Sequence, residues 1–521
     1  MKLKYKVRTA EGEEERTFSY IPLRFIAAIL LSVAMTLAVI GIVMALCHYV
    51  SYFYLAAMAT QVAAAITIIA SSDNPDYKIP WLVIVLLIPV GGFMLYYLFY
   101  SRKPDRKYRR RMPLIRSSKA FRVPPDCSRD IYRAGPPAAT QAKMLCTISG
   151  SHIYPAGELR YFPLGEDMFA QMLRDLQTAE RFIFLEYFII EEGLFWNSIL
   201  DILKEKAAQG VEVKLIYDDI GCMMTLPGNY YQTLRDFGIE AVPFAFLKGN
   251  ADSEFNNRSH RKLLIIDGTI GYTGGVNLAD EYINAIVKYG HWKDIGIRLA
   301  GSGVQELTKL FFEDFSINSR EMPRILPSHF PQQAAGTSNG YVVPFGDGPR
   351  PFYRRQVGKC VIQNMLASAN RYMWIMSPYL VIDNELCMSL ENAALRGVDV
   401  RIIVPHIPDK QLIFEMTRSS YPQLMEAGVK IYEYTPGFIH AKCYLADSLY
   451  AMVGTINLDY RSLVHHYEDG VWMYRCPVID TIRDDFTSTF EKSRRVRRGD
   501  LRTSLPRRVL RAALKLFAPM M

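Results

Sequence analysis

Residues 260–267 read HRKLLIID, and residues 440–447, 180 positions later in the chain, read HAKCYLAD. Both stretches fit the pattern H-x-K-x4-D. After six further residues, each is followed by a small-residue turn and an asparagine, GGVN at residues 274–277 and GTIN at residues 454–457. Two copies with the same offsets do not arise by coincidence, so the chain carries a duplicated set of one histidine, one lysine and one asparagine.

The chemistry of this set suits one phosphodiester. Residues 263–266 and 441–445 are expected to be strands, on which positions i and i+2 share a face, so each imidazole projects beside an ammonium group. Lysine and asparagine donate hydrogen bonds to anionic oxygens, and histidine attacks or shuttles protons near neutral pH. For a single copy, the alternative is a surface strand with a solvated lysine. The candidate catalytic residues are His260, Lys262, Asp267, His440, Lys442 and Asp447, with Asn277 and Asn457 as phosphate-binding residues.

The paired motif resembles that of the phospholipase D superfamily, H-x-K-x4-D-x6-G-[GST]-x-N, and the resemblance is strongest to its bacterial cardiolipin synthases. It extends over residues 257–262, 274–282, 291–294 and 454–462 and over the apolar segment before them. The resemblance implies a two-step transfer through a phosphohistidine, without a metal or other cofactor, that joins two phosphatidylglycerols and releases glycerol. One departure is that the family usually reads Asn-Phe-Glu where residues 466–468 read His-Tyr-Glu.

A nucleophilic histidine needs an acid that orients its other ring nitrogen. Each half offers one acid at a position where the family carries it. Asp294 lies 34 residues after His260, and Glu468 lies 28 residues after His440. We expect Asp294 to hold His260 and Glu468 to hold His440. The alternative is that both are ordinary carboxylates at strand ends.

Other ionisable residues are assigned smaller roles. Asp267 and Asp447 are interpreted as turn residues rather than proton carriers. Glu186 has no acidic counterpart in the second half, and it either lines the headgroup pocket or caps a strand. Four further histidines lack metal-ligand spacing, which predicts no metal site and packing or solvated roles for them. They are His291, His406, His465 and His466. Headgroup contact stays open for His465 and His466, because they lie near Glu468 in sequence.

The duplication extends beyond the motifs. Residues 181–190 (RFIFLEYFII) parallel residues 371–380 (RYMWIMSPYL), and residues 209–216 (QGVEVKLI) parallel residues 396–403 (RGVDVRII). Apolar strands that alternate with helices predict an α/β fold with a largely buried sheet. We expect two homologous phospholipase D-like α/β halves in a pseudo-twofold arrangement, with both motifs at their boundary and N-terminal transmembrane helices before them. The predicted segments are a membrane segment at 1–112, halves at 113–325 and 340–490, a linker around 327–339, and a basic tail at 491–521.

Two long uncharged runs precede the halves. Residues 25–72 and 79–101 contain no Asp, Glu, Lys or Arg. The second run fits one spanning helix of about 20 residues, with Trp81 at one edge and Tyr96 towards the other as in an interfacial aromatic belt; the first is long enough for two. Residues 102–111 hold seven basic residues, which by the positive-inside rule stay in the cytoplasm with everything after them. This predicts a multi-pass plasma-membrane protein with a cytoplasmic catalytic domain, and leaves the side of the N-terminus open.

The composition fits a membrane enzyme. Half of the 521 residues are apolar, the formal net charge is +9, and the eight cysteines are scattered as expected of reduced thiols. Residues 492–515 hold ten basic residues. Residues 506–521 place apolar side chains at helical spacing, which predicts either a membrane-surface helix on anionic lipid or a helix packed on the domain.

Three functions fit these observations. They are a membrane-bound phosphatidyltransferase that makes cardiolipin, a phospholipase or nuclease of the same superfamily, and an inactive scaffold. Complete motifs in both halves argue against the scaffold. The apolar segments and basic flanks favour a phospholipid partner, phosphatidylglycerol in an anionic membrane, over nucleic acid. Oligomeric state is left open by the sequence.

Overall fold

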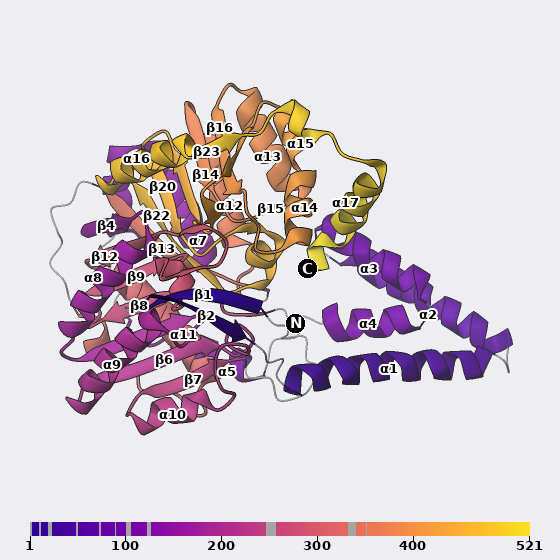
Figure 1. The fold of residues 1–521 in the computed structure, drawn as a ribbon, viewed down its shortest axis with the longest axis horizontal. Helices are drawn as coiled ribbons and strands as arrows, with labels where there is room; N and C mark the ends of the chain where they lie inside the picture. Colours follow the sequence, from indigo (N-terminus) through magenta and orange to yellow (C-terminus); the bar gives the residue numbers. More distant parts are fainter. Residues whose placement is uncertain are drawn as a thin grey trace.

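The computed structural model describes residues 3–9, 12–18, 23–47, 51–71, 74–88, 90–100, 106–121, 127–245, 257–331, 340–350 and 352–520. Figure 1 shows a body of β-sheets and covering helices, from which the N-terminal helices project to one side. These helices are α1 (Leu23–Cys47), α2 (Ser51–Ala70), α3 (Pro75–Leu87) and α4 (Gly91–Tyr100).

The first half contains a seven-stranded sheet. Its strand order is β4 (Glu158–Phe162), β12 (Gly296–Ala300), β9 (Ile270–Gly274), β8 (Leu263–Ile266), β5 (Phe182–Tyr187), β6 (Glu212–Asp218) and β7 (Glu240–Phe244). In β5, Phe182 and Phe184 face the centre of the molecule while Ile183 and Leu185 face the outer helices, as in a strand covered on both sides. Strands β5, β6 and β7 run parallel, and the others are antiparallel to their neighbours.

The second half repeats this order within a nine-stranded sheet. Its strand order is β23 (Ser493–Arg495), β17 (Lys430–Tyr434), β16 (Asp399–Pro405), β14 (Tyr372–Met376), β19 (Cys443–Ala446), β20 (Tyr450–Gly454), β22 (Glu468–Tyr474), β13 (Tyr341–Asp347) and β3 (Tyr154–Pro155). The seven strands from β17 to β13 match those from β7 to β4 one for one in order and direction. The duplicated α/β fold predicted from the repeats is therefore confirmed.

Helices cover the outer face of each sheet and also fill the space between the sheets. The outer helices are α8 (Gly165–Gln177), α9 (Leu194–Ala208) and α10 (Tyr230–Asp236) on the first sheet, and α7 (Pro136–Ser149), α12 (Val357–Ser368), α13 (Asn384–Leu395) and α15 (Tyr421–Glu426) on the second. The central helices are α11 (Val304–Asn318) and α16 (Val478–Glu491). Phe311, Phe315 and Phe486 are fully buried there, each contributing on the order of 2–3 kcal/mol by burial. The two halves therefore share one core.

The segment before the first half packs differently from the predicted division at residue 113. Helices α6 (Ser128–Ala134) and α7 pack on the second sheet, and strand β3 is part of it. Ala138 and Leu145 of α7 share a core there with Val343 and Phe345. Helix α5 (Arg106–Arg116) lies instead on α11 of the first half. This stretch of chain therefore ties the two halves together. Part of the predicted linker, residues 332–339, lies outside the described residues.

The prediction of one helix over residues 79–101 is wrong. Helices α3 and α4 contact each other, and the ring centroids of Trp81 and Tyr96, expected towards opposite ends of one helix, lie 5.5 Å apart. A Cβ at Gly92 would lie 2.5 Å from the carbonyl oxygen of Ile84, so this close crossing requires glycine. Within the part of the chain that the structure describes, none of the helices combines the length and the apolarity needed to cross a membrane.

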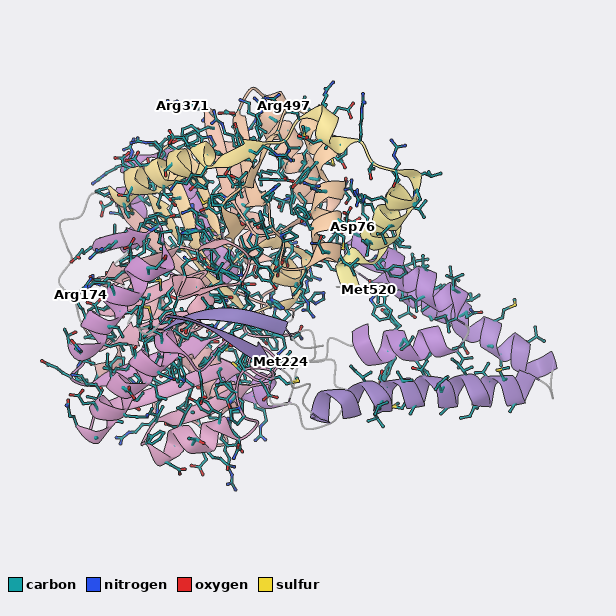
Figure 2. All side chains as sticks on the ribbon, in the orientation of Figure 1. Asp76, Arg174, Met224, Arg371, Arg497 and Met520 are labelled. Carbon is teal, nitrogen blue, oxygen red and sulfur yellow. The ribbon has the colours of Figure 1, made fainter. Side chains whose placement is uncertain are left out.

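The projection is attached to the second half at the start of α3. Nδ2 of Asn74 donates a hydrogen bond to Oδ2 of Asp383 at 2.9 Å. The backbone N–H of Asn384 donates to Oδ2 of Asp76 at 3.0 Å. Figure 2 labels Asp76 and Met520 where the projection meets the body. These contacts fix the base of the projection relative to the second sheet.

The N-terminal hairpin is attached to the first half. Strands β1 (Leu3–Thr9) and β2 (Gly12–Phe18) pair with each other, and β1 also pairs with β10 (Ile286–Val287), with Lys6 opposite Val287. Because β10 belongs to the first half, the chain before α1 and the chain after α4 meet on the same side of the projection. The sequence left this relation open.

The C-terminal helix combines features of both predicted alternatives. Helix α17 (Leu505–Phe517) packs on α14 (Gln411–Ser419), where Arg511 and Glu415 form an ion pair of 2.8 Å. The helix nevertheless presents an apolar face outward. The exposed apolar side chains of α17 are Leu505, Val509, Leu510 and Phe517. The helix is therefore docked by a mixed face, in which Leu514 packs beside the ion pair of Arg511, and its membrane-surface role stays a prediction.

Asp267 and Asp447 form equivalent turns after β8 and β19. Both have left-handed backbone, with φ of 52° and 57°, which aspartate tolerates better than most residues. The carboxylate of Asp447 accepts three backbone N–H hydrogen bonds at 2.8 Å, and that of Asp267 accepts three at 2.8–2.9 Å. Their donors are Asn370, Arg371 and Tyr372, and Glu180, Arg181 and Phe182. This geometry agrees with the structural role predicted for both aspartates.

Replacing Asp447 by alanine removes the acceptor of three backbone N–H groups, so we expect the free energy of unfolding to fall by about 3 kcal/mol. Asparagine keeps one acceptor oxygen and tolerates left-handed backbone, so Asp447→Asn should cost less. Urea denaturation followed by tryptophan fluorescence measures both changes. An Asp447→Ala protein with unchanged stability and no activity would instead assign Asp447 a direct catalytic role.

Candidate active site

The second motif begins beside a strand of the first half. Strand β11 (His291–Lys293) pairs in parallel with β18 (Gly437–Ile439), and the backbone N–H of His440 donates to the carbonyl oxygen of Lys293 at 2.7 Å. The residue after Lys293 is Asp294, which is thereby placed beside His440. Nδ1 of His440 lies 2.6 Å from Oδ2 of Asp294.

The first motif has the same relation to the second half. Ser259 pairs in parallel with Tyr467, and the backbone N–H of His260 donates to the carbonyl oxygen of Tyr467 at 2.8 Å. The next residue, Glu468, therefore lies beside His260, with Oε2 at 2.9 Å from Nδ1. The two arrangements are related by the pseudo-twofold of the duplicated fold.

The prediction that each acid orients the histidine of its own half is wrong. Asp294 holds His440, and Glu468 holds His260. The physical reason is that the strand segment leading to each acid pairs with the segment leading to the other half's histidine. Neither half alone therefore contains a histidine with its carboxylate.

Residues of each small-residue turn, together with Ser462, lie against the acids that orient the motif histidines. The hydroxyl groups of Thr455 and Ser462 donate to Glu468, the latter at 2.6 Å. Gly275 is the counterpart of Thr455 in the first motif, and a Cβ there would lie 1.9 Å from Oδ1 of Asp294. The difference between Gly-Gly and Gly-Thr in the two motifs thus reflects the different size and surroundings of the two acids.

Burial makes both motif imidazoles neutral near pH 7. Removal from water lowers the pKa of His260 well below its usual range, although Glu468 opposes this. Burial and the neighbouring Lys442 lower the pKa of His440 to about 4. Burial favours the neutral form of Glu468, but its interactions with His260 and His466 outweigh burial and lower the pKa of Glu468. A neutral imidazole whose Nδ1–H is held by a carboxylate has a lone pair on Nε2.

The motif lysines are buried cations. Lys262 and Lys442 are 1% and 0% exposed. Burial lowers the pKa of Lys262 to about 8 and that of Lys442 to about 7, while nearby carboxylates oppose the shift. Nζ of Lys262 donates to the carbonyl oxygen of His260 at 2.8 Å, and Nζ of Lys442 lies 3.0 Å from Nε2 of His440. Because a bound anion would stabilise both ammonium groups, the site is suited to phosphate.

The two motif asparagines differ in their contacts. Nδ2 of Asn277 donates to the hydroxyl of Tyr282 at 2.7 Å, and its Oδ1 accepts from the backbone of Ile189 at 3.1 Å. The ring of Tyr282 lies 5.4 Å from that of His440 between centroids, so Asn277 supports a tyrosine at the site. Oδ1 of buried Asn457 has no hydrogen-bond partner among the described residues. The phosphate-binding role of both stays a prediction.

Glu186 is fully buried next to the first motif, so it does not line a headgroup pocket. It is 0% exposed, and its Oε1 accepts a hydrogen bond from Oγ of Ser259 at 2.5 Å. Burial and the charge of Asp314 raise the pKa of Glu186 well above its ordinary value. Arg258 also anchors this segment through a buried ion pair of 2.9 Å with Asp218, which sequence reasoning missed. The one sign of this ion pair in the sequence is that Asp218 lies at the end of a predicted strand.

His466 is a site residue to which sequence reasoning assigned a minor role. It is 8% exposed, and its ring centroid lies 5.4 Å from that of His260. Among the described residues, His260, His466 and Glu468 are the one group of three whose ligand atoms, all within 4.8 Å of one another, come close enough to hold a metal ion. The oxygens of Glu468 already accept hydrogen bonds from His260 and Ser462, so we interpret Glu468 as the acceptor for His260 rather than as a metal ligand.

Two family models match the chain. The model described as cardiolipin synthase, PLD-like domain, matches residues 172–288 and 362–490, once in each half. The model described as phospholipase D-nuclease N-terminal matches residues 60–99. Among solved structures, the fold is similar to that of phosphatidylserine synthase from Haemophilus influenzae, with 14% identity, a TM-score of 0.55, and coverage of 73% of this chain and 98% of that chain.

Curated relatives align over most of the chain. It is 41% identical over 451 residues to an uncharacterised protein of Streptococcus mutans, which covers 85% of this chain and 96% of that protein. It is 31% identical over 468 residues to cardiolipin synthase of Halalkalibacterium halodurans, with coverage of 89% of this chain and 92% of that protein. It is 32% identical over 436 residues to cardiolipin synthase of Alkalihalophilus pseudofirmus, with coverage of 83% of this chain and 86% of that protein. The chain therefore belongs to the cardiolipin synthases of the phospholipase D superfamily and is a phosphatidyltransferase.

Proposed function

We propose that this chain is a membrane-bound cardiolipin synthase. It transfers a phosphatidyl group from one phosphatidylglycerol to a second and releases glycerol, through a phosphohistidine. The observation that carries this proposal is the pair of neutral, buried histidines, each held by a carboxylate of the opposite half, beside two buried lysines. Such a set supplies a nucleophile, a proton carrier and positive charge for one phosphodiester.

His260 is proposed as the nucleophile. Nζ of Lys442 lies 2.7 Å from Nδ1 and 3.0 Å from Nε2 of His440, so the ammonium group lies against this ring and hinders its approach to phosphorus. Both motif lysines donate to the backbone carbonyl of their own motif histidine. In the part of the chain that the structure describes, Nζ of Lys262 makes no hydrogen bond to the ring of His260, so the Nε2 lone pair of His260 is available. His440 is then the proton carrier.

The reaction proceeds in two balanced steps. In the first, Nε2 of His260 forms a bond to phosphorus, the bond between phosphorus and the glycerol oxygen breaks, and that oxygen takes a proton from His440. The negative phosphate raises the pKa of His440 on binding, which supplies this proton. In the second, a hydroxyl of another phosphatidylglycerol gives its proton to His440 and attacks phosphorus, and the bond to His260 breaks. The groups proposed to hold the non-bridging oxygens are those of Lys262, Lys442, Asn277 and Asn457.

Membrane attachment is proposed from the surface of the projection. Leu30, Leu37 and Met44 of α1 are 61%, 62% and 70% exposed, and a large exposed apolar surface is typical of a membrane-interacting segment. Because β1 pairs with β10, any crossings of the membrane by α1–α4 are even in number. The basic stretches at 102–111 and 492–515 favour placing the two halves against anionic lipid on the cytoplasmic side of the plasma membrane.

Purified protein mixed with phosphatidylglycerol vesicles should form one cardiolipin and one glycerol for every two phosphatidylglycerols consumed, without added nucleotide. Lipid mass spectrometry and an enzymatic glycerol assay give this ratio. Formation of phosphatidic acid alone would make the enzyme a phospholipase. A requirement for a CDP-linked donor would place it in another class of transferase.

Substitution of either His260 or His440 by alanine should lower turnover by about 10⁴-fold or more, because the two act as one unit. In His440→Asn protein, acid quenching with phosphorus-labelled phosphatidylglycerol should leave the label on His260. The matched His260→Asn protein is the control and should carry none. Label on His440 in that control would reverse the assignment of the two roles.

The pH dependence of kcat/KM should report the buried lysines of the free enzyme. Since the pKa of Lys442 is lowered to about 7 and that of Lys262 to about 8, each loses its charge as the pH rises through these values. We therefore expect kcat/KM to fall between about pH 7 and about pH 9. Lys442→Arg keeps its charge over this range and should move the start of the fall upward. A flat profile in the unchanged enzyme would contradict this assignment.

A further inference from the structure

His466 lies beside His260 and Glu468 in the active site. Its side chain is 8% exposed, and its ring centroid lies 5.4 Å from that of His260 and 6.3 Å from that of Phe188. Neither ring nitrogen has a hydrogen-bond partner among the residues that the structure describes. A buried polar group without a partner costs about 1–3 kcal/mol. A ligand that enters the site would remove this cost.

The neighbouring carboxylate cannot take the hydrogen bond of His466. Nδ1 of His466 lies 3.7 Å from Oε1 of Glu468, which is too far for a hydrogen bond. That oxygen already lies 3.0 Å from Nδ1 of His260 and accepts from Oγ of Ser462 at 2.6 Å. Its two lone pairs are therefore occupied. The N–H of His466 is left for an acceptor from outside the protein.

The position of His466 indicates which substrate atom accepts its hydrogen bond. In the proposed reaction the glycerol oxygen leaves on the side of His440, opposite the attacking nitrogen of His260. His466 stands on the His260 side, beside the ring that bonds to phosphorus. In in-line attack, the atoms around the attacking nitrogen are the two non-bridging oxygens and the retained ester oxygen. The non-bridging oxygens carry the negative charge and are the strong hydrogen-bond acceptors.

We propose that His466 is a phosphate-binding residue of this site, whose Nε2–H donates a hydrogen bond to one non-bridging oxygen as charge builds during attack by His260. The inference rests on the proposed function, because it takes its ligand to be a phospholipid phosphodiester. His466 forms no covalent bond and passes no proton. It adds a donor on the His260 side, where Lys262 is directed to a backbone carbonyl.

Phosphorothioate phosphatidylglycerol, in which sulfur replaces one non-bridging oxygen, tests this contact directly. Sulfur accepts hydrogen bonds poorly, so the donor matters for one diastereomer and not for the other. Glycerol release is measured for His466→Phe, which keeps an aromatic ring, and His466→Asn, which keeps an N–H donor. The control is His465→Asn, because His465 is the adjacent histidine and its ring lies against Tyr77, 6.1 Å between centroids. EDTA in all assays removes adventitious metal from the cluster of His260, His466 and Glu468.

With the oxygen substrate, His466→Phe should release glycerol about 100-fold more slowly, the size expected for one lost transition-state donor, and His466→Asn should stay within about tenfold of the unchanged enzyme. With one phosphorothioate diastereomer, His466→Phe should differ from the unchanged enzyme by less than about threefold. The ratio of the two diastereomers is read within one preparation, so it does not depend on the folded fraction; His466→Asn provides a second variant if His466→Phe is unstable. His465→Asn should behave as the unchanged enzyme.

Equal slowing of the oxygen substrate and both diastereomers would assign His466 a packing role and overturn the inference, as would unchanged rates throughout. Glycerol release requires only the first step. If the unchanged enzyme releases glycerol but forms no cardiolipin, the proposed transfer to a second phosphatidylglycerol fails while the test of His466 still stands. If cardiolipin forms and the diastereomer ratio is the same in all variants, the role of His466 fails alone.

Discussion

The hydrogen bond between each motif histidine and the carboxylate of the opposite half is the interaction on which the site depends. His260 is held by Glu468 and His440 by Asp294, across the boundary between two sheets. Because each acid follows a segment paired with the other half's motif, both sheets must be complete and correctly docked before either histidine is oriented. The shared core around α11 and α16 keeps that docking fixed.

Burial gives these residues their chemical character. Away from water the two imidazoles are neutral, and the two motif lysines have lowered pKa values because the nearby carboxylates offset the loss of hydration only in part. A phosphodiester would change this balance, since its charge stabilises the cations and allows His440 to carry a proton. The site is therefore built for an anionic substrate, and its catalytic protonation states arise when that substrate binds.

The structure also relates the reaction centre to the N-terminal helices. The start of α3 is hydrogen-bonded to the second half through Asn74 and Asp76, and Tyr77 packs against Tyr460, which directly precedes the segment leading to His466. The N-terminal hairpin joins the first half. The apolar projection is thus held by both halves, which fixes its orientation relative to the site.

The sequence by itself determined the duplicated α/β fold, the motif residues and the turn role of Asp267 and Asp447, because these follow from local patterns repeated in each half. The tertiary structure alone decided which acid serves which histidine, the fold of residues 79–101 into two contacting helices, and the place of His466 beside His260. Each of these depends on contacts between segments far apart in the chain: the pairing of β11 with β18, the crossing at Gly92, and the approach of the two motifs. Residue type and spacing along one strand or helix carry no record of such contacts, so the sequence suggested that each acid orients the motif histidine of its own half.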